Sequence, residues 1–234
     1  MTDTKESFKK WVDDYKKVSA NQTALAWPSE TLVRLFKGPY VPGMVGKNFG
    51  GQKALEVGCG SGNNLFFLAS LGLDLAGTEI DPEIIKITAN VLKSRGVSAE
   101  LRTGTNRQLP FPDAEFDYLV SWNVIHYEDN EADMKAAIVE YARVLRPGGR
   151  FFLSTTGPEH AILKDSRPLE AHRYQIGRAD DFRKGQVFFY FDSPADIHFY
   201  FRPHFNDVRV GRTHDQLMTE TLDWWIVTGV KAAL

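Results

Sequence analysis

The chain has a single cysteine, Cys59, among its 234 residues. One thiol cannot form a disulfide within the chain and cannot build a cysteine-rich metal cluster. Histidines, cysteine and acidic residues also lack the spacing typical of metal ligands, so we expect no bound metal ion. A chain with one thiol suits a reducing compartment, and we therefore expect a cytoplasmic protein.

Long apolar runs are missing as well. No stretch approaches the length of a membrane-spanning helix, and residues 1–17 are rich in charge without the apolar segment of a signal peptide. The charges nearly cancel, with 28 Lys and Arg against 30 Asp and Glu, so nothing indicates a polyanionic partner. We expect no membrane partner, and the sequence carries no strong signal for a nucleic acid as partner.

The length of the chain and its 43% hydrophobic content suffice to bury one core of ordinary size. We expect an α/β core at residues 51–234 and an N-terminal helical cap with linker at residues 1–50. In that cap, residues 8–37 predict two amphipathic helices separated at residues 27–30, with Pro28 at the first position of the second helix.

A short apolar strand at residues 54–57 runs into a turn with glycine at alternate positions, Gly58, Gly60 and Gly62. Glycines permit backbone torsions that other residues resist, and they let the main chain approach a ligand at a helix N-terminus. A dinucleotide-binding turn reads G-x-G-x-x-G/A, but Asn63 stands at its last position. The turn predicts a nucleotide site without a pyrophosphate.

Glu79 ends a second apolar strand, about twenty residues after the first glycine. A carboxylate at that place can hold ribose hydroxyls, which argues against the alternative of an ordinary strand-to-helix turn. The runs E-V-G-C-G-S-G at 56–62 and T-E-I-D-P-E-I-I at 78–85 resemble the class I S-adenosylmethionine-dependent methyltransferases. The family's later motifs are similar to L-P-F-P-D-A-E-F-D-Y-L-V-S at 109–121 and A-R-V-L-R-P-G-G-R-F-F-L-S at 142–154.

The resemblance covers roughly half of the chain and implies both fold and cofactor. The implied fold is a Rossmann-like three-layer sandwich around a seven-stranded, mostly parallel sheet in the order 3-2-1-4-5-7-6, with the seventh strand antiparallel. S-adenosyl-L-methionine is the implied cofactor. Trp224 and Trp225, in the last predicted strand, should point to opposite faces and pack.

Ligands of open parallel sheets lie beyond the carboxyl ends of the strands. On that basis and by resemblance, we expect the cofactor to contact Glu56, Gly58, Gly60, Gly62, Glu79, Ile80, Thr105, Asn106, Asn123 and Trp27.

Two of these expectations carry alternatives. Thr105 replaces an acid that commonly holds the adenine edge in the family, so either Asn106 or a backbone amide takes over that role. Tyr15 and Trp27 are candidates to cover the methionine end, with plain packing as the alternative. Asn123 is expected to reach the donor's sugar or methionine portion through its side-chain amide.

Methyl transfer from a sulfonium is an in-line displacement in which positioning supplies much of the acceleration. A hydroxyl or protonated amine would also need a base, and histidine has a suitable pKa. His126 stands near the expected site in the run Asn123 to Tyr127 and is our candidate general base. The alternative is a structural histidine bonded to a backbone carbonyl.

Residues 159–200 are longer than a plain crossover requires, and we interpret them as a lid over the methyl acceptor. Arg173 or Arg178 could bind a carboxylate or phosphate there, unless the segment is simply a solvated surface of mixed charge. The aromatic run at residues 187–191 could stack on a flat acceptor or form a strand at a dimer edge.

Missing signatures narrow the acceptor. The Asp/Asn-Pro-Pro-Tyr motif of methyltransferases acting on nucleobase or glutamine amino groups is absent at residues 122–125, and no Pro-Cys nucleophile exists. We therefore expect methyl transfer to the oxygen or nitrogen of a small molecule, by a monomer or homodimer. The alternatives are a methyltransferase acting on protein or RNA, and a non-catalytic subunit that binds S-adenosylmethionine.

Overall fold

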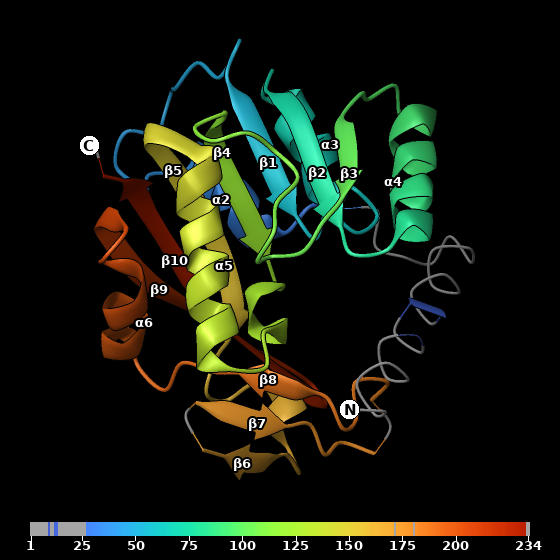
Figure 1. Cartoon of the computed structure of the whole chain (residues 1–234), viewed down its shortest axis with the longest axis vertical. Coiled ribbons are helices and arrows are strands. Elements are labelled where there is room, and N and C mark those ends of the chain that lie inside the picture. The colour runs from blue at the N-terminus through green and yellow to red at the C-terminus, as the bar shows by residue number, and fades with distance from the viewer. Residues whose placement is uncertain (1–8, 10–11, 14–26, 171, 180, 233–234) are drawn as a thin grey trace.

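The computed structural model describes residues 27–170, 172–179 and 181–232, together with residues 9, 12 and 13. Its main sheet has seven strands in the order β3-β2-β1-β4-β5-β10-β9 (Figure 1). The strands are β1 (Lys53–Val57), β2 (Asp74–Glu79), β3 (Glu100–Thr103), β4 (Phe116–Trp122), β5 (Leu145–Thr156), β9 (Phe205–Leu217) and β10 (Glu220–Lys231).

The first five strands pair in parallel, and β10 is antiparallel to both β5 and β9. Since β9 and β10 are the sixth and seventh strands of this sheet in chain order, the predicted order 3-2-1-4-5-7-6 and the Rossmann-like fold class are confirmed.

Helices cover both faces of this sheet. They are α2 (Glu30–Lys37), α3 (Asn63–Ser70), α4 (Pro82–Ser94), α5 (Glu131–Val144) and α6 (Pro194–Phe201), with short 3₁₀ turns η1 (Ile125–Tyr127) and η2 (Ala161–Leu163). Strand β4 shows how the two cores divide, because alternate side chains point to opposite faces. Leu119 packs into the core that contains α5 and α6, whereas Tyr118 and Val120 pack into the core that contains α2 and α3.

The helix starts follow local signals in the sequence. Asp81 caps α4 by accepting a hydrogen bond from the Glu83 amide at 2.7 Å, with Pro82 at the first helical position as predicted. The expectation for Pro28 is wrong, because Ser29 is the N-cap of α2 and Pro28 precedes it. The first predicted N-terminal helix falls largely outside the described residues.

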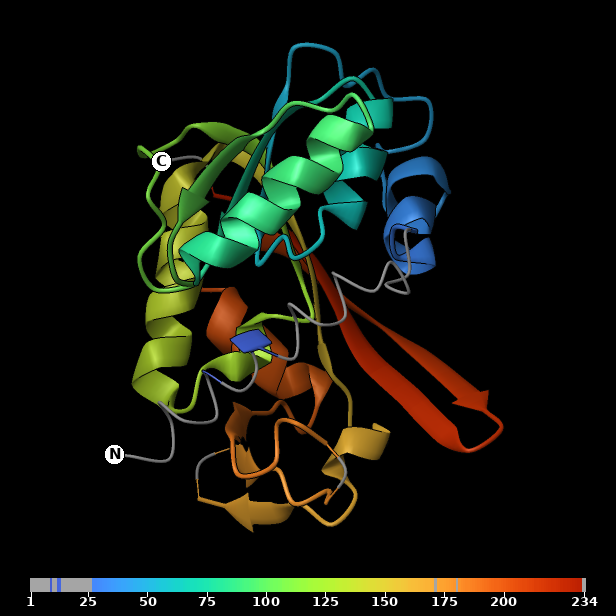
Figure 2. The same ribbon diagram turned by 90° about the vertical axis from the view of Figure 1, so that its right-hand side faces the viewer.

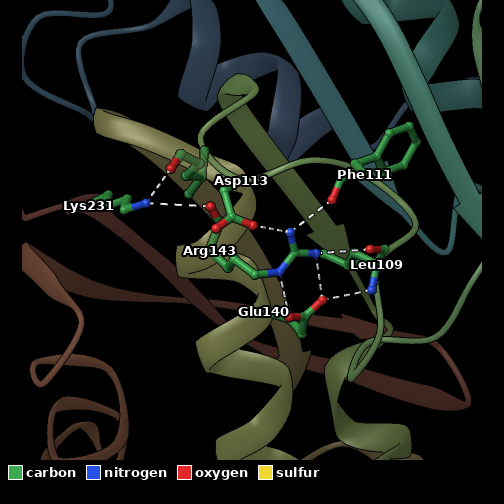
Figure 3. Close-up of polar contacts among 7 residues, drawn as sticks. Leu109, Phe111, Asp113, Glu140, Arg143 and Lys231 are labelled. Atoms are coloured by element: carbon green, nitrogen blue, oxygen red, sulfur yellow. Dashed lines mark hydrogen bonds and ion pairs between the residues drawn. The ribbon is translucent and has the colours of Figure 1, made fainter.

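The loop that joins β3 to β4 is fastened to α5 by one guanidinium (Figure 3). Arg143 donates to the carbonyl oxygens of Leu109 at 2.9 Å and Phe111 at 2.8 Å, and it forms ion pairs with Asp113 and Glu140, each at 2.7 Å. Glu140 in turn accepts from the Leu109 amide at 2.8 Å. These bonds fix the end of a loop whose beginning lines the cavity described below.

The predicted lid contains a small antiparallel sheet of β6 (Arg167–Leu169), β7 (Arg173–Gln175) and β8 (Val187–Phe189), which lies beyond one end of the main sheet (Figures 1 and 2). Hydrogen bonds around β8 join the lid to the core. The Phe189 amide donates to the Glu128 carbonyl at 3.0 Å, and the Trp225 indole donates to the Phe191 carbonyl at 2.9 Å.

The structure bears on one of the two roles predicted for the aromatic run at residues 187–191, namely stacking on an acceptor. Phe188, Phe189 and Phe191 are almost fully buried, and Tyr190 is nearly so. Their rings pack against each other and against neighbours such as Tyr200. The buried rings are therefore not exposed for stacking on an acceptor. Residues 187–189 do form a strand, β8, and its place at a dimer edge stays a prediction.

The closing hairpin of β9 and β10 projects from the sheet (Figure 2). Trp225 packs into the core with α5, whereas Trp224 packs into the opposite one, which confirms that the two indoles point to opposite faces. Among the described residues, no helix combines the length and the hydrophobicity needed to span a membrane.

Candidate functional site

A cavity of about 360 Å³ opens at the carboxyl ends of β1, β2 and β4. Its wall is built by the glycine turn, the end of β2, the loop after β3, the segment after β4, and Gln186 and Val187 of the lid. Open α/β sheets bind ligands at this edge, and mostly apolar cavities of this size with a few polar groups are typical ligand sites.

The glycine turn meets the cavity through Gly58 and Gly60. Gly58 has a φ of 65°, and a Cβ atom there would lie 2.5 Å from Cγ2 of Val124. Gly62 does not line the cavity; it is the left-handed N-cap of α3, and a Cβ there would lie 2.9 Å from the side chain of Leu92. Gly62 therefore permits the packing of α3 against α4.

Glu79 presents a rigid carboxylate to the cavity. Its Oε1 accepts from the Gly60 amide at 2.8 Å, and its Oε2 accepts from the Ile80 amide at 3.1 Å. Burial raises the pKa of the Glu79 carboxyl, and these two amide bonds oppose the rise. Each oxygen keeps a lone pair for a further donor, such as a ligand hydroxyl.

Glu56 does not line the cavity but lies behind the residues that do. Its Oε1 accepts from the Asn64 amide at 2.7 Å, and Oδ1 of Asn64 accepts from the Ser29 amide at 3.0 Å. The second oxygen of Glu56 is buried and has no hydrogen-bond partner among the described residues. Burial raises the pKa of Glu56 to about 8. The carboxyl thus connects β1, α3 and the start of α2.

Thr105 and Asn106 line the cavity as predicted, but the side chain of Asn106 is already engaged. Its Nδ2 donates to Oε1 of Glu128 at 2.9 Å, and its Oδ1 accepts from the Tyr141 hydroxyl at 2.7 Å. Tyr141 is also 2.9 Å from Oγ of Ser121. Of the two roles left open by the sequence, this geometry favours the backbone amide as the adenine contact.

Asn123 also lines the cavity, in a left-handed conformation with a φ of 60°. Its backbone amide donates to Oγ of Ser154 at 2.9 Å, and its Oδ1 accepts from the same hydroxyl. The described residues offer no partner to its Nδ2, which is thus available to a ligand. Ile80 adds an apolar side chain to the wall that is 45% exposed.

His126 does not reach the cavity, so the structure does not support it as a general base. The side chain is 1% exposed, and its Nδ1 has no partner among the described residues. The imidazole packs against Tyr127 and Phe188, with ring centroids 4.9 and 4.7 Å away. Burial lowers its pKa well below the usual value, and the charges of Arg183 and His160 lower it further.

Trp27 is a second correction. Its side chain is 77% exposed, and it is not among the described residues that line the cavity. The indole precedes the N-cap of α2 and points to solvent, so it does not cover a ligand in this structure. Tyr15, the other aromatic candidate for that role, lies outside the described residues.

The sequence reasoning missed the wall that follows His126. Tyr127, Glu128 and Asp129 all line the cavity. Nε of Arg107 is 3.2 Å from Glu128, and its Nη1 is 2.7 Å from Asp133. The run Tyr-Glu-Asp, a few residues after the end of β4, was the available signal, because polar residues at that edge belong to the site.

The lid arginines are engaged elsewhere. Arg178 forms an ion pair with Glu220 at 2.5 Å, and Arg173 donates to the Glu170 carbonyl at 3.0 Å. Neither is among the described residues lining the cavity. Within the described chain, one set of side chains has metal-ligand spacing, namely His172, Asp192 and Asp196, and it lies apart from the cavity residues.

Comparison with known proteins agrees with this geometry. Residues 55–153 match the family described as a methyltransferase domain. The chain is 28% identical over 116 residues to the uncharacterized methyltransferase YcgJ of Bacillus subtilis, covering 49% of this chain and 45% of that protein. It is 33% identical over 101 residues to the demethylmenaquinone methyltransferase of Tropheryma whipplei, covering 43% and 40%. The chain thus spans less than half the length of these relatives.

A solved structure shares the fold over most of the chain. The methyltransferase from Methanosarcina mazei superposes with a TM-score of 0.67 at 18% identity, covering 89% of this chain and all of that one. Residues 55–153 are therefore a class I S-adenosylmethionine-dependent methyltransferase domain, and S-adenosylmethionine is its cofactor.

Proposed function

We propose that this chain transfers a methyl group from S-adenosylmethionine to an oxygen or nitrogen atom of a small molecule. The observation that carries the proposal is the fixed carboxylate of Glu79 beside Gly60, at the carboxyl end of β2. Two backbone amides aim this carboxylate, so it can accept hydrogen bonds from a pair of ribose hydroxyls without rearrangement.

The remaining wall fits the cofactor. Gly58 exposes main chain to the cavity, and its missing Cβ leaves the space that the Val124 side chain fills. Ile80 offers an apolar surface to a flat base, the backbone near Thr105 can hold its polar edge, and Nδ2 of Asn123 is a donor for the sugar or amino acid portion.

When bound, the cofactor supplies a methyl group on a positively charged sulfur, which needs no further activation. The chain's own residues then bind, orient and exclude water. Gln186 and Val187 of the lid close one side of the cavity, and Tyr127 and Glu128 are the polar groups beside them. With His126 outside the cavity, we assign the acceleration to positioning of the acceptor rather than to a histidine base.

A small acceptor is favoured because it would share one cavity of about 360 Å³ with the cofactor, beside the lid. The nearly balanced charge of the chain gives no support to RNA as the acceptor. A cytoplasmic location, and a monomer or homodimer as the working state, remain predictions from the sequence. A non-catalytic subunit that only binds the cofactor is the alternative that turnover would remove.

Calorimetric titration with S-adenosylmethionine and S-adenosylhomocysteine tests the cofactor site. We expect micromolar dissociation constants for both, and Glu79→Ala should weaken binding by about 1–3 kcal/mol, because charge-assisted bonds are lost. Glu115→Ala is the matched control, since Glu115 lies at the other end of β4 and pairs with Lys53. Release of S-adenosylhomocysteine with a panel of small acceptors then tests turnover.

If neither compound bound to folded protein, the proposed function would fail. If both bound and no small acceptor, protein or RNA were methylated, the subunit alternative would replace it.

A further inference from the structure

The wall of the cavity next to the lid carries an excess of negative charge. Glu128 and Asp129 line the cavity, and Asp133 stands close by on α5. Arg107 is the one cationic residue among the described lining residues, and all three carboxylates act on its guanidinium. Three carboxylates that share one guanidinium leave an excess of two negative charges.

The lid does not offset this excess. The half-buried guanidinium of Arg183 in the lid is bound by Asp181 through two contacts, at 2.8 and 2.7 Å, and hydrogen-bonds Tyr127. Arg183 itself is not part of the described lining. The ion pair between Arg183 and Asp181 is neutral as a unit, so the field at this end of the cavity is set by Glu128 and Asp129.

The carboxylates are held in place between the two sides of the site. Oε1 of Glu128 accepts from Asn106 at 2.9 Å, and its backbone carbonyl accepts from Phe189 of the lid at 3.0 Å. Asp129 is exposed and accepts from Nδ2 of Asn130 at 2.7 Å. One carboxylate is thus inside the wall, and the other is at its opening to solvent.

Apolar and aromatic surface surrounds these charges. Trp122, Tyr127 and Val187 contribute side chains to the same cavity. Aromatic faces attract cations, and this attraction adds to that of nearby carboxylates. Carboxylates within an apolar and aromatic wall favour binding of a ligand with a positive charge on an apolar body. They disfavour binding of a ligand that carries a carboxylate or phenolate.

We propose that the methyl acceptor is a small organic amine with an aromatic or aliphatic body, which enters as an ammonium ion held by Glu128 and Asp129. This inference rests on the proposed function and names its substrate class. Before methylation the ammonium must lose a proton. Asp129, at the opening to solvent, takes that proton and passes it to water, which leaves the nitrogen lone pair for the methyl group.

The test measures binding, so it does not depend on turnover. Protein saturated with S-adenosylhomocysteine is titrated with 2-phenylethylamine and with 3-phenylpropionate, which share an aromatic body and differ in the sign of charge. We expect the amine to bind at least about tenfold more tightly than the acid, and raised salt to narrow the difference.

Two variants test whether Asp129 and Glu128 cause the tighter binding of the amine. Asp129→Asn and Glu128→Gln should each weaken amine binding by about fivefold to tenfold and leave the acid unchanged or slightly improved. Glu131→Gln is the charge-matched control from the same segment. Glu131 is partly exposed, pairs with Lys135 at 2.7 Å and accepts from the Tyr200 hydroxyl at 3.2 Å, outside the cavity lining. This variant should change amine affinity less than about twofold.

The outcomes separate the two proposals. Failure of S-adenosylhomocysteine to bind would refute the proposed function itself. Normal binding of that compound, with the acid bound as tightly as the amine or with neither bound, would overturn the amine class. Equal effects of Glu131→Gln and Asp129→Asn would also overturn it. A Glu128→Gln variant that lost affinity for S-adenosylhomocysteine alone would remove Glu128 from the acceptor site.

Discussion

His126 and Tyr127 are consecutive residues whose rings lie 4.9 Å apart between centroids, but only Tyr127 reaches the cavity. Both belong to the 3₁₀ turn η1, in which successive side chains are separated by about one third of a turn. The turn therefore aims one ring at the ligand site and the other into the interior between the core and the lid.

We expect His126→Phe to retain most of its methyl transfer, because the imidazole touches no ligand and phenylalanine preserves the ring contacts with Phe188. The measurement is kcat and KM with the best acceptor found. A loss of kcat by about a hundredfold or more, with folding intact, would restore His126 as a catalytic base.

The two buried histidines also predict a pH dependence of stability. Burial lowers the pKa of His126 well below its usual value and lowers that of His160 to about 4. The unfolded chain, with an ordinary histidine pKa near 6.5, then binds more protons than the folded chain. The free energy of unfolding should fall as the pH drops below about 6.5, and the contribution of His160 should level off near pH 4.

Urea denaturation at a series of pH values measures this dependence. His126→Phe cannot take up a proton in either state, so its free energy of unfolding should fall less steeply than that of the wild type below pH 6.5. His204→Asn is the control variant, because His204 lies in the turn after α6 and outside the cavity lining. Parallel curves for the wild type and His126→Phe would contradict the prediction.

The fold and half of the site could be predicted because their signals are local. The glycine turn, Glu79 and the Asp81-Pro82 start of α4 each lie within a strand-to-helix unit, and the structure places them as expected. Hydrophobic periodicity is local as well, whereas the order of the strands was predicted from the resemblance to the family.

The site residues that the sequence analysis missed or misassigned owe their positions to contacts with distant parts of the chain. The partner of Glu128 is Asn106, which lies in the preceding loop of the sheet, and the aromatic run at 187–191 is buried only because the lid folds back on the core. His126 was chosen by its residue type, although the sequence does not say which of two consecutive side chains in a short turn faces the ligand.

Glu56→Gln should stabilise the protein in alkali. Burial raises the pKa of Glu56 from 4.5 to about 8, so the folded chain holds this proton more tightly than the unfolded chain. That contribution is complete below pH 4.5 and is lost as the pH rises through about 8. Glutamine stays neutral and can still accept from Asn64.

Thermal unfolding of ligand-free protein at pH 6 and pH 9 tests this prediction. The midpoint of the wild type should fall between these pH values by at least about 4 °C more than that of Glu56→Gln. Glu100→Gln provides the control, because Glu100 is exposed on β3 and pairs with Arg102. Equal falls for all three proteins would show that Glu56 is ionised in the folded state.

The variant Gly58→Ala should lose stability for two separate reasons, which are backbone strain and overlap of side chains. The left-handed backbone of Gly58 opposes any side chain by about 1–2 kcal/mol. The new Cβ would also meet Val124 at 2.5 Å, and such overpacking costs about 1–3 kcal/mol more. Gly46→Ala is the matched control, because Gly46 has a φ of 68° with no atom within 4 Å of the added Cβ.

We expect Gly46→Ala to lower the free energy of unfolding by the backbone cost alone and to leave the affinity for S-adenosylhomocysteine unchanged. Gly58→Ala should lower stability further and weaken that affinity, because the new methyl group displaces Val124 and both residues line the cavity. The double variant Gly58→Ala with Val124→Ala tests this cause directly. It should recover stability relative to Gly58→Ala if the overlap is responsible, whereas no recovery would assign the whole loss to the backbone.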